Sequence, residues 1–191
     1  MVCIPYAGGG AGVFHLWAAA LGNEVEVRAV QLPGRQDRLA EPALSVLSDV
    51  VASLAAALWG LPPAPLVLYG HSYGALLAFE LSRRLRRHGQ APAALCLAAQ
   101  PAAQLPRRHE PIGSLPAPQF KGALLRRFDL PRQVVDNDEL LALSLPPLRA
   151  DLQAVETYHY APEALLDTPI TLLHGSQDTL VSRAEVNAWR E

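Results

Sequence analysis

The stretch Tyr69–Leu81, YGHSYGALLAFEL, places a serine between two glycines, after an apolar run and before a helical pattern. Residues 70–74 (GHSYG) match G-x-S-x-G, in which small flanking residues let the backbone close a tight strand-to-helix turn beneath an exposed serine. The apolar run before it (PLVLY, 65–69) and the helical pattern after it (ALLAFELSRRL, 75–85) supply the context that this motif requires. The sequence therefore predicts that Ser72 is a nucleophile at a helix N-terminus, where developing negative charge is favoured.

Short apolar runs alternate with longer helical patterns on both sides of this stretch. The runs predict strands over residues 2–5, 24–32, 66–69, 93–98 and 170–174. Apolar residues at steps of three and four predict helices over 44–58 and 75–87, the second with Gly89 as its C-terminal cap. Strand–helix alternation favours an α/β fold, a mostly parallel sheet with helices on both faces and right-handed crossovers.

Composition limits the function classes. The 191 residues suffice for one domain with a substantial core, and we expect a single domain over 1–191. The net charge of −2 gives no global attraction to nucleic acid or to an anionic membrane, and no apolar run approaches membrane-spanning length. Cys3 and Cys96 lie in apolar runs and are interpreted as core residues of a reduced, cytoplasmic protein. The N-terminus has no signal-peptide pattern, and neither cysteine has a neighbour at metal-ligand spacing.

One long segment interrupts the strand–helix alternation. Residues 101–161 contain no convincing strand and are rich in proline and arginine, with short helical pieces over 116–128, 137–145 and 146–160. A helical insertion of this length between core strands is typical of a lid over an active site. A structural helical cap without a gating role has the same pattern, and the sequence does not separate the two.

Two further loops complete a candidate site. The glycines of PYAGGG (5–10) let backbone N–H groups approach a substrate, and the N–H groups of Ala7 and Tyr73 form a candidate oxyanion hole. A phosphate cradle is disfavoured, because no G-K-[ST] follows and the spacing is not G-x-G-x-x-G. Asp178, in HGSQD (174–178), follows the last predicted strand and can hold an imidazole in the order Ser…Asp…His. The alternative is a turn aspartate that satisfies its own backbone.

Five segments in order make the chain resemble the type II, or editing, thioesterases of non-ribosomal peptide and polyketide assembly lines. They are IPYAGGGAGVFHLWAAAL (4–21), VRAVQLPGRQDRLAEP (27–42), LYGHSYGALLAFELSRRL (68–85), LPPLRADLQAVETYHY (145–160) and PITLLHGSQDTLV (169–181). GHSYG alone fits many hydrolases, whereas the second and fourth segments are far more specific.

This resemblance implies an α/β-hydrolase that cleaves acyl thioesters on the phosphopantetheine arms of acyl or peptidyl carrier proteins. It implies that Ser72 is the nucleophile, that Asp178 is the triad acid and that the segment after Gln100 is the lid. No cofactor is required, because serine supplies the nucleophile. We expect a monomer, and arginines such as Arg107 and Arg108 as aids to the docking of an acidic carrier.

The family's catalytic histidine follows the acid, but no histidine follows Asp178 here. The chain has six histidines, His15, His71, His88, His109, His159 and His174, and we expect none to replace it, with His174 the nearest to the acid in sequence. Without its base a serine stays protonated and is a poor nucleophile. We therefore expect a fragment of a longer active enzyme, whose last strand and helix lie beyond Glu191. The alternatives are a catalytically impaired protein that binds carrier protein, and a generic carboxylesterase.

Overall fold

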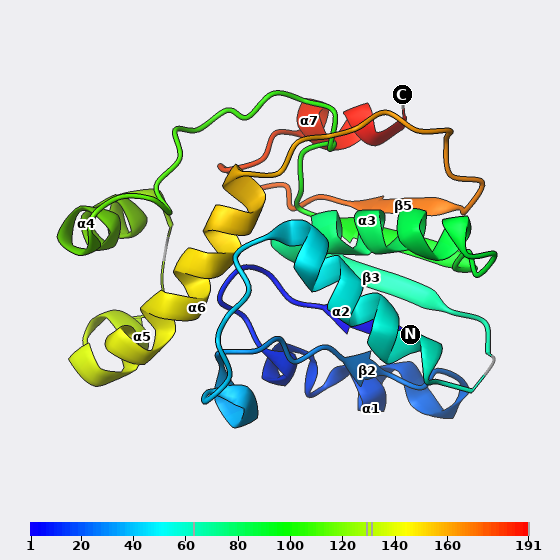
Figure 1. The fold of residues 1–191 in the computed structure, drawn as a ribbon, viewed down its shortest axis with the longest axis horizontal. Helices are drawn as coiled ribbons and strands as arrows, with labels where there is room; N and C mark the ends of the chain where they lie inside the picture. The colour runs from blue at the N-terminus through cyan, green and yellow to red at the C-terminus, as the bar shows by residue number, and fades with distance from the viewer. Residues whose placement is uncertain (63, 129, 131, 191) are drawn as a thin grey trace.

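The chain forms a parallel β-sheet flanked by helices (Figure 1). The computed structural model describes all residues except 63, 129, 131 and 191. In the described part the strand order is β2-β1-β3-β4-β5, and every neighbouring pair is parallel. The strands are β1 (Val2–Ile4), β2 (Arg28–Ala29), β3 (Val67–His71), β4 (Ala94–Ala98) and β5 (Ile170–Leu173). The predicted parallel α/β architecture is confirmed.

The helices lie between the strands as the alternation predicts, with three in the segment 101–161. They are α1 (Trp17–Leu21), α2 (Leu47–Trp59), α3 (Tyr73–Arg87), α4 (Ala117–Arg127), α5 (Arg132–Val135), α6 (Asp138–Glu156) and α7 (Arg183–Asn187). Short 3-10 helices cover Ala11–Phe14, Gly22–Glu24, Gln36–Arg38 and Ala188–Arg190. None of the helices in the described residues is long and apolar enough to cross a membrane.

Alternate residues of the central strands face two different cores. Val2, Ile4 and Leu68 belong to the larger core, with the buried sides of α2 and α3. Cys3 and Tyr69 point the other way and pack with Phe14 and Trp17 from the segment that contains α1. This period of two, with apolar residues on both faces, is what a sheet covered on both sides requires. Cys3 is fully buried and, like Cys96, is a free thiol.

The second strand is much shorter than its sequence pattern predicts. Residues 24–32 alternate, but only Arg28 and Ala29 pair with β1. The reason is that β1 itself has only three residues, so it offers few backbone partners on that side. The other strand predictions agree with the structure to within two residues at each end.

Two helix ends follow directly from local sequence. Gly89 has φ +72°, and the N–H groups of Gly89 and Gln90 donate to the carbonyls of Arg86 and Leu85 at 2.9 Å each. This is a Schellman motif, so the predicted C-terminal cap of α3 is confirmed. At the start of α6 the Asn137 side chain accepts hydrogen bonds from the N–H groups of Glu139 and Leu140.

Helix α6 is longer than expected, because it continues through Pro146 and Pro147. The two helical pieces predicted over 137–145 and 146–160 are therefore one helix. A proline has no N–H, so the carbonyls of Ala142 and Leu143 lose their usual partners inside the helix. Figure 1 shows α4, α5 and α6 together at one end of the sheet.

Candidate active site

Ser72 lies in a strained turn between β3 and α3. Its backbone has φ 51° and ψ −119°, a left-handed conformation that side chains rarely adopt. The Ser72 N–H donates to the Ala98 carbonyl at 2.8 Å, and its own carbonyl accepts from Ala75 at 2.8 Å. The turn is therefore tied to strand β4 on one side and to α3 on the other. This is the geometry that the G-x-S-x-G pattern predicts.

The two glycines beside Ser72 are required by close backbone contacts. A Cβ on Gly70 would lie 2.1 Å from the Gly74 carbonyl oxygen. A Cβ on Gly74 would lie 2.2 Å from the carbonyl oxygen of Ile4 and 2.6 Å from that of Pro5. Because these contacts are with backbone, no side-chain movement relieves them. The start of α3 therefore packs directly on the end of β1, from which the glycine-rich loop leaves.

The glycine-rich loop brings the Ala7 N–H to the same place. The Gly8 N–H donates to Asp151 Oδ2 at 2.7 Å, and the Gly9 N–H donates to the Tyr6 carbonyl at 2.9 Å. Within the described part of the chain, the N–H groups of Ala7 and Tyr73 have no recorded acceptor. Both residues line the cavity that Ser72 lines.

Asp178 follows β5 and lines the same cavity. Its Oδ1 accepts hydrogen bonds from the N–H groups of Leu180 at 2.9 Å and Val181 at 3.0 Å. The turn that the alternative interpretation expects is therefore present. Among the described residues no hydrogen bond to Oδ2 is recorded, so this oxygen can still accept one. The turn fixes the carboxylate and leaves one oxygen for a further partner.

Three of the six histidines line the cavity. His174 is nearest to Asp178 in sequence, but its Nε2 lies 2.9 Å from the Val181 carbonyl oxygen, and it is not among the residues that line the cavity. His71, His109 and His159 do line it. Burial lowers the pKa of His71, and the negative charge of Asp178 offsets part of that shift. His88 and His15 are exposed: His88 caps α3 through the Arg84 carbonyl, and His15 follows the 3-10 helix Ala11–Phe14.

The cavity has a volume of about 540 Å³, which is in the range of small-molecule sites. Its apolar wall includes Leu76, Phe128, Leu152 and Val155. Arg107, Arg108, His109 and Arg127 also line it, and the first three are exposed. An acyl chain fits the apolar wall, while an anionic group fits the basic side chains. No group of three or more potential metal ligands occurs among the described residues.

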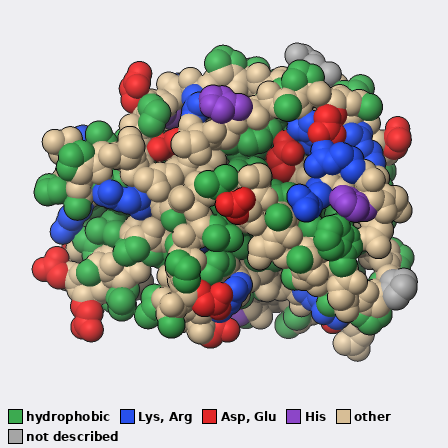
Figure 2. Space-filling model, viewed as in Figure 1, with side chains coloured by type: hydrophobic (Ala, Val, Ile, Leu, Met, Phe, Trp, Pro, Cys, Tyr) green, Lys and Arg blue, Asp and Glu red, His purple; other side chains and the backbone are tan. Residues whose placement is uncertain are grey.

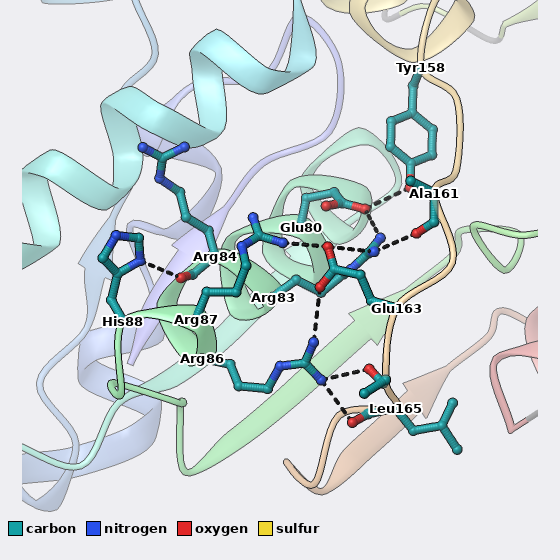
Figure 3. Close-up of polar contacts among 11 residues, drawn as sticks. Glu80, Arg83, Arg84, Arg86, Arg87, His88, Tyr158, Ala161, Glu163 and Leu165 are labelled. Atoms are coloured by element: carbon teal, nitrogen blue, oxygen red, sulfur yellow. Dashed lines mark hydrogen bonds and ion pairs between the residues drawn. The ribbon is translucent and has the colours of Figure 1, made fainter.

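The far end of α3 holds the connection between α6 and β5 (Figure 3). Glu163 forms ion pairs with three arginines, at 2.9 Å to Arg83, 3.0 Å to Arg86 and 2.5 Å to Arg87. Arg83 also pairs with Glu80, which accepts a hydrogen bond from the Tyr158 hydroxyl. Basic side chains gather over this part of α3 in Figure 2. Arginines on a helix are usually solvated, but Arg83 is only 3% exposed, because the connecting segment covers it.

The sequence interpretation also missed the pairing of Arg35 with Asp151. These residues form a buried ion pair between the loop after β2 and helix α6. They lie in the two segments that carry the more specific family resemblance, VRAVQLPGRQDRLAEP and LPPLRADLQAVETYHY. Each segment contains a charged residue, and this was the only sign of a possible ion pair. The sequence does not show the contact, because the two residues are 116 positions apart.

A parallel sheet with a serine on a strained turn, next to a glycine-rich loop and an acid after the last strand, defines the α/β-hydrolase class. Comparison with known proteins places the chain within that class. The chain belongs to the thioesterase domain family, whose model matches residues 1–191. The predicted fold class and thioesterase family are confirmed.

The relatives come from natural-product pathways. The chain is 36% identical to the gramicidin S biosynthesis protein GrsT of Aneurinibacillus migulanus, over 100% of this chain and 75% of that protein. It is 38% identical to thioesterase PikA5 of Streptomyces venezuelae, over 100% of this chain and 68% of the relative. The type II thioesterase BorB from the borrelidin biosynthetic cluster superposes with a TM-score of 0.85 at 38% identity, covering 99% of this chain and 75% of BorB.

Proposed function

We propose that the chain is a thioesterase that hydrolyses acyl groups from the phosphopantetheine arms of acyl or peptidyl carrier proteins in polyketide or non-ribosomal peptide biosynthesis. One observation carries the proposal. Ser72, on its strained turn, opens into a cavity of about 540 Å³ that Ala7, Tyr73 and Asp178 also line. The family match and the pathways of the relatives support the thioester as the bond that is cleaved.

The proposed reaction begins with attack of Ser72 Oγ on the thioester carbonyl carbon. The resulting oxyanion accepts hydrogen bonds from the N–H groups of Ala7 and Tyr73, for which no acceptor occurs among the described residues. The C–S bond then breaks, the pantetheine thiol leaves with a proton, and an acyl-serine remains. Water adds to the acyl-serine, and the free acid is released as Ser72 recovers its proton.

Asp178 is proposed to orient and stabilise an imidazole that takes the Ser72 proton. Residues 179–191 contain no histidine. Loss of a triad base costs on the order of 10^4–10^6 in kcat in serine hydrolases, with residual catalysis from the oxyanion hole. Free imidazole added to the solution offers a direct test of this role in residues 1–191.

The test measures hydrolysis of hexanoyl-pantetheine by the chain and by its Ser72→Ala variant, each with and without imidazole. We expect Ser72-dependent turnover that rises with imidazole concentration. Cooperation between Ser72 and Asp178 is tested by the variant Asp178→Asn, which should reduce the increase in rate that imidazole produces. Equal rates for the parent and Ser72→Ala, with retained affinity for an acyl carrier protein, would instead favour a non-catalytic carrier-binding protein.

The choice between thioester and oxygen ester is tested with matched substrates. Hexanoyl-pantetheine and ethyl hexanoate offer the same acyl group, so only the leaving group differs. We expect the thioester to have the higher kcat/KM. A preference for the oxygen ester would favour a generic carboxylesterase.

The basic side chains at the cavity are proposed to help dock an acidic carrier protein. Arg107 and Arg108 are exposed, and among described residues Arg107 has no ion-pair partner. Changing both to glutamate should raise KM for acyl-carrier protein while leaving KM for acyl-pantetheine unchanged. We further propose a monomer that acts in the cytoplasm, and light scattering of the purified chain tests its oligomeric state.

A further inference from the structure

A buried ion pair joins two segments that lie far apart in sequence. Arg35 Nη1 donates to Asp151 Oδ2 at 2.6 Å, and Nη2 donates to Oδ1 at 2.9 Å. The Arg35 side chain is 6% exposed and that of Asp151 is 1% exposed. This bidentate geometry fixes the orientation of the two side chains and the distance between them, unlike a single contact between flexible side chains. Helix α6 is therefore held rigidly against the loop after β2.

The same pair holds the glycine-rich loop. Asp151 Oδ2 accepts the Gly8 N–H at 2.7 Å, and Arg35 Nη1 also donates to the Gly9 carbonyl at 3.1 Å. These two residues directly follow Ala7, the proposed oxyanion donor. Fixing the peptide groups on its C-terminal side restricts the direction in which the Ala7 N–H points.

Helix α6 also packs against this loop through an apolar contact. A Cβ built on Gly8, whose φ is +76°, would lie 3.1 Å from Leu148 Cδ1. Leu148 and Asp151 are three residues apart, so they lie on the same face of α6. One face of α6 thus supplies both a packing surface and a hydrogen-bond acceptor to the loop.

The second proposed oxyanion donor is close to the same pair. The Tyr73 side chain is 1% exposed, and its hydroxyl has no hydrogen-bond partner among the described residues. Burial raises the pKa of this phenol, and the Asp151 charge raises it further while Arg35 lowers it, so the ring lies within the field of the pair. The side chain of Tyr73, whose N–H is the second proposed donor, is therefore within electrostatic reach of the pair.

We propose that Arg35 and Asp151 are positioning residues, which fix the glycine-rich loop so that the Ala7 N–H faces the oxyanion. The inference rests on the proposed function, because that function makes the Ala7 N–H an oxyanion donor. It assigns no contact between the ion pair and the substrate. It makes helix α6 part of the catalytic geometry as well as a cover for the cavity. Any movement of α6 that separates the pair also releases the loop.

The test removes the pair without leaving a buried charge. Replacing a buried ion pair by apolar residues of similar volume is often neutral or stabilising, so Arg35→Met with Asp151→Val should fold. Asp151→Asn, made together with Arg35→Met, is the conservative variant, since it removes both charges and keeps an oxygen that can accept the Gly8 N–H. The exposed pair of Arg28 and Glu26, 2.8 Å apart, supplies the control as Arg28→Gln with Glu26→Gln.

Binding of two probes separates positioning from cavity shape. Hexylboronic acid forms a bond between boron and Ser72 Oγ, releases the hydroxyl proton to solvent and places a negatively charged tetrahedral boronate in the oxyanion hole. Hexanol fills the acyl cavity without forming that bond. Calorimetry measures both affinities, and boron NMR verifies the tetrahedral adduct. Amide hydrogen exchange of Gly8 reports on the loop independently of any ligand.

We expect the apolar pair variant to bind hexylboronic acid about 10- to 100-fold more weakly, as for a misplaced oxyanion donor, with hexanol affinity unchanged. Gly8 exchange should accelerate in this variant, the conservative variant should be intermediate, and the exposed-pair control should match the parent. Unchanged boronate affinity in the apolar pair variant overturns the inference. Boronate affinity that survives Ser72→Ala instead overturns the proposed nucleophile, so the two failures are distinguishable.

Discussion

Replacing Gly74 by alanine should disrupt both the packing and the chemistry of the site. The new Cβ would lie 2.2 Å from the Ile4 carbonyl oxygen, whereas ordinary contacts begin at 3.4 Å. Strand β1 and helix α3 must therefore separate by about 1 Å, and both belong to the main core. We expect this overpacking to lower the free energy of unfolding by about 3 kcal/mol, the upper end of the usual range. The total free energy of unfolding of a domain is roughly 5–15 kcal/mol.

The same displacement moves the two proposed oxyanion donors apart. The Tyr73 N–H belongs to the start of α3, whereas the Ala7 N–H follows β1. Misplacement by about 1 Å can cost on the order of 100-fold in rate, so activity should fall further than the folded fraction does. Urea unfolding gives the stability, and the imidazole-assisted hydrolysis rate gives the function under conditions where the variant is folded.

A second glycine provides the control. Gly60 follows α2 with φ −81°, and among the described residues a Cβ there would meet only the Ala57 carbonyl oxygen at 3.8 Å. Gly60→Ala should therefore leave the protein as stable as the parent or up to about 1 kcal/mol more stable. If Gly74→Ala has the same urea midpoint and hydrolysis rate as the parent, the reasoning about the α3–β1 contact is refuted.

Three other predictions concern the supports of the site. Burial raises the pKa of Glu163, but its arginine partners outweigh burial and hold that pKa below its ordinary value. Its contribution to the free energy of unfolding is therefore complete above the pKa of glutamate in the unfolded chain, about 4.3, and is lost as the pH falls. Glu163→Gln should lower the free energy of unfolding by about 1 kcal/mol at pH 7 and by less at pH 3, as measured by urea unfolding. Asn137→Ala removes the acceptor at the start of α6 and should cost about 1 kcal/mol, with faster amide exchange in the first turn of α6. Ser182→Ala breaks the reciprocal cap with Glu185 and should cost about 1 kcal/mol; unchanged thermal unfolding would contradict this account of α7.

Local patterns predicted the parts of this protein that depend on local physics. The apolar runs located the strands, Gly89 located the end of α3, and the two glycines beside Ser72 located its turn. These predictions succeed because each depends on residues that are neighbours in the sequence. The resemblance to editing thioesterases added the family, which the sequence spacing alone did not define.

The features that were missed depend on contacts across the chain. Arg83 is buried only because a segment about 80 residues later covers it, and Arg35 meets Asp151 across 116 residues. Helix α6 continues through Pro146 because tertiary packing outweighs the local cost of proline. A single sequence carries no direct record of such long-range contacts.

The two prolines of α6 also determine where this helix can bend. They interrupt the ladder of backbone hydrogen bonds at residues 142 and 143, and the Ser144 hydroxyl donates to the Leu140 carbonyl at 2.7 Å nearby. The half of α6 after the prolines carries Asp151 and is clamped by Arg35, while the half before them contacts α5. Bending of α6 is therefore expected at this point. Such bending would displace the half before the prolines, while the half that Arg35 clamps keeps the glycine-rich loop in place.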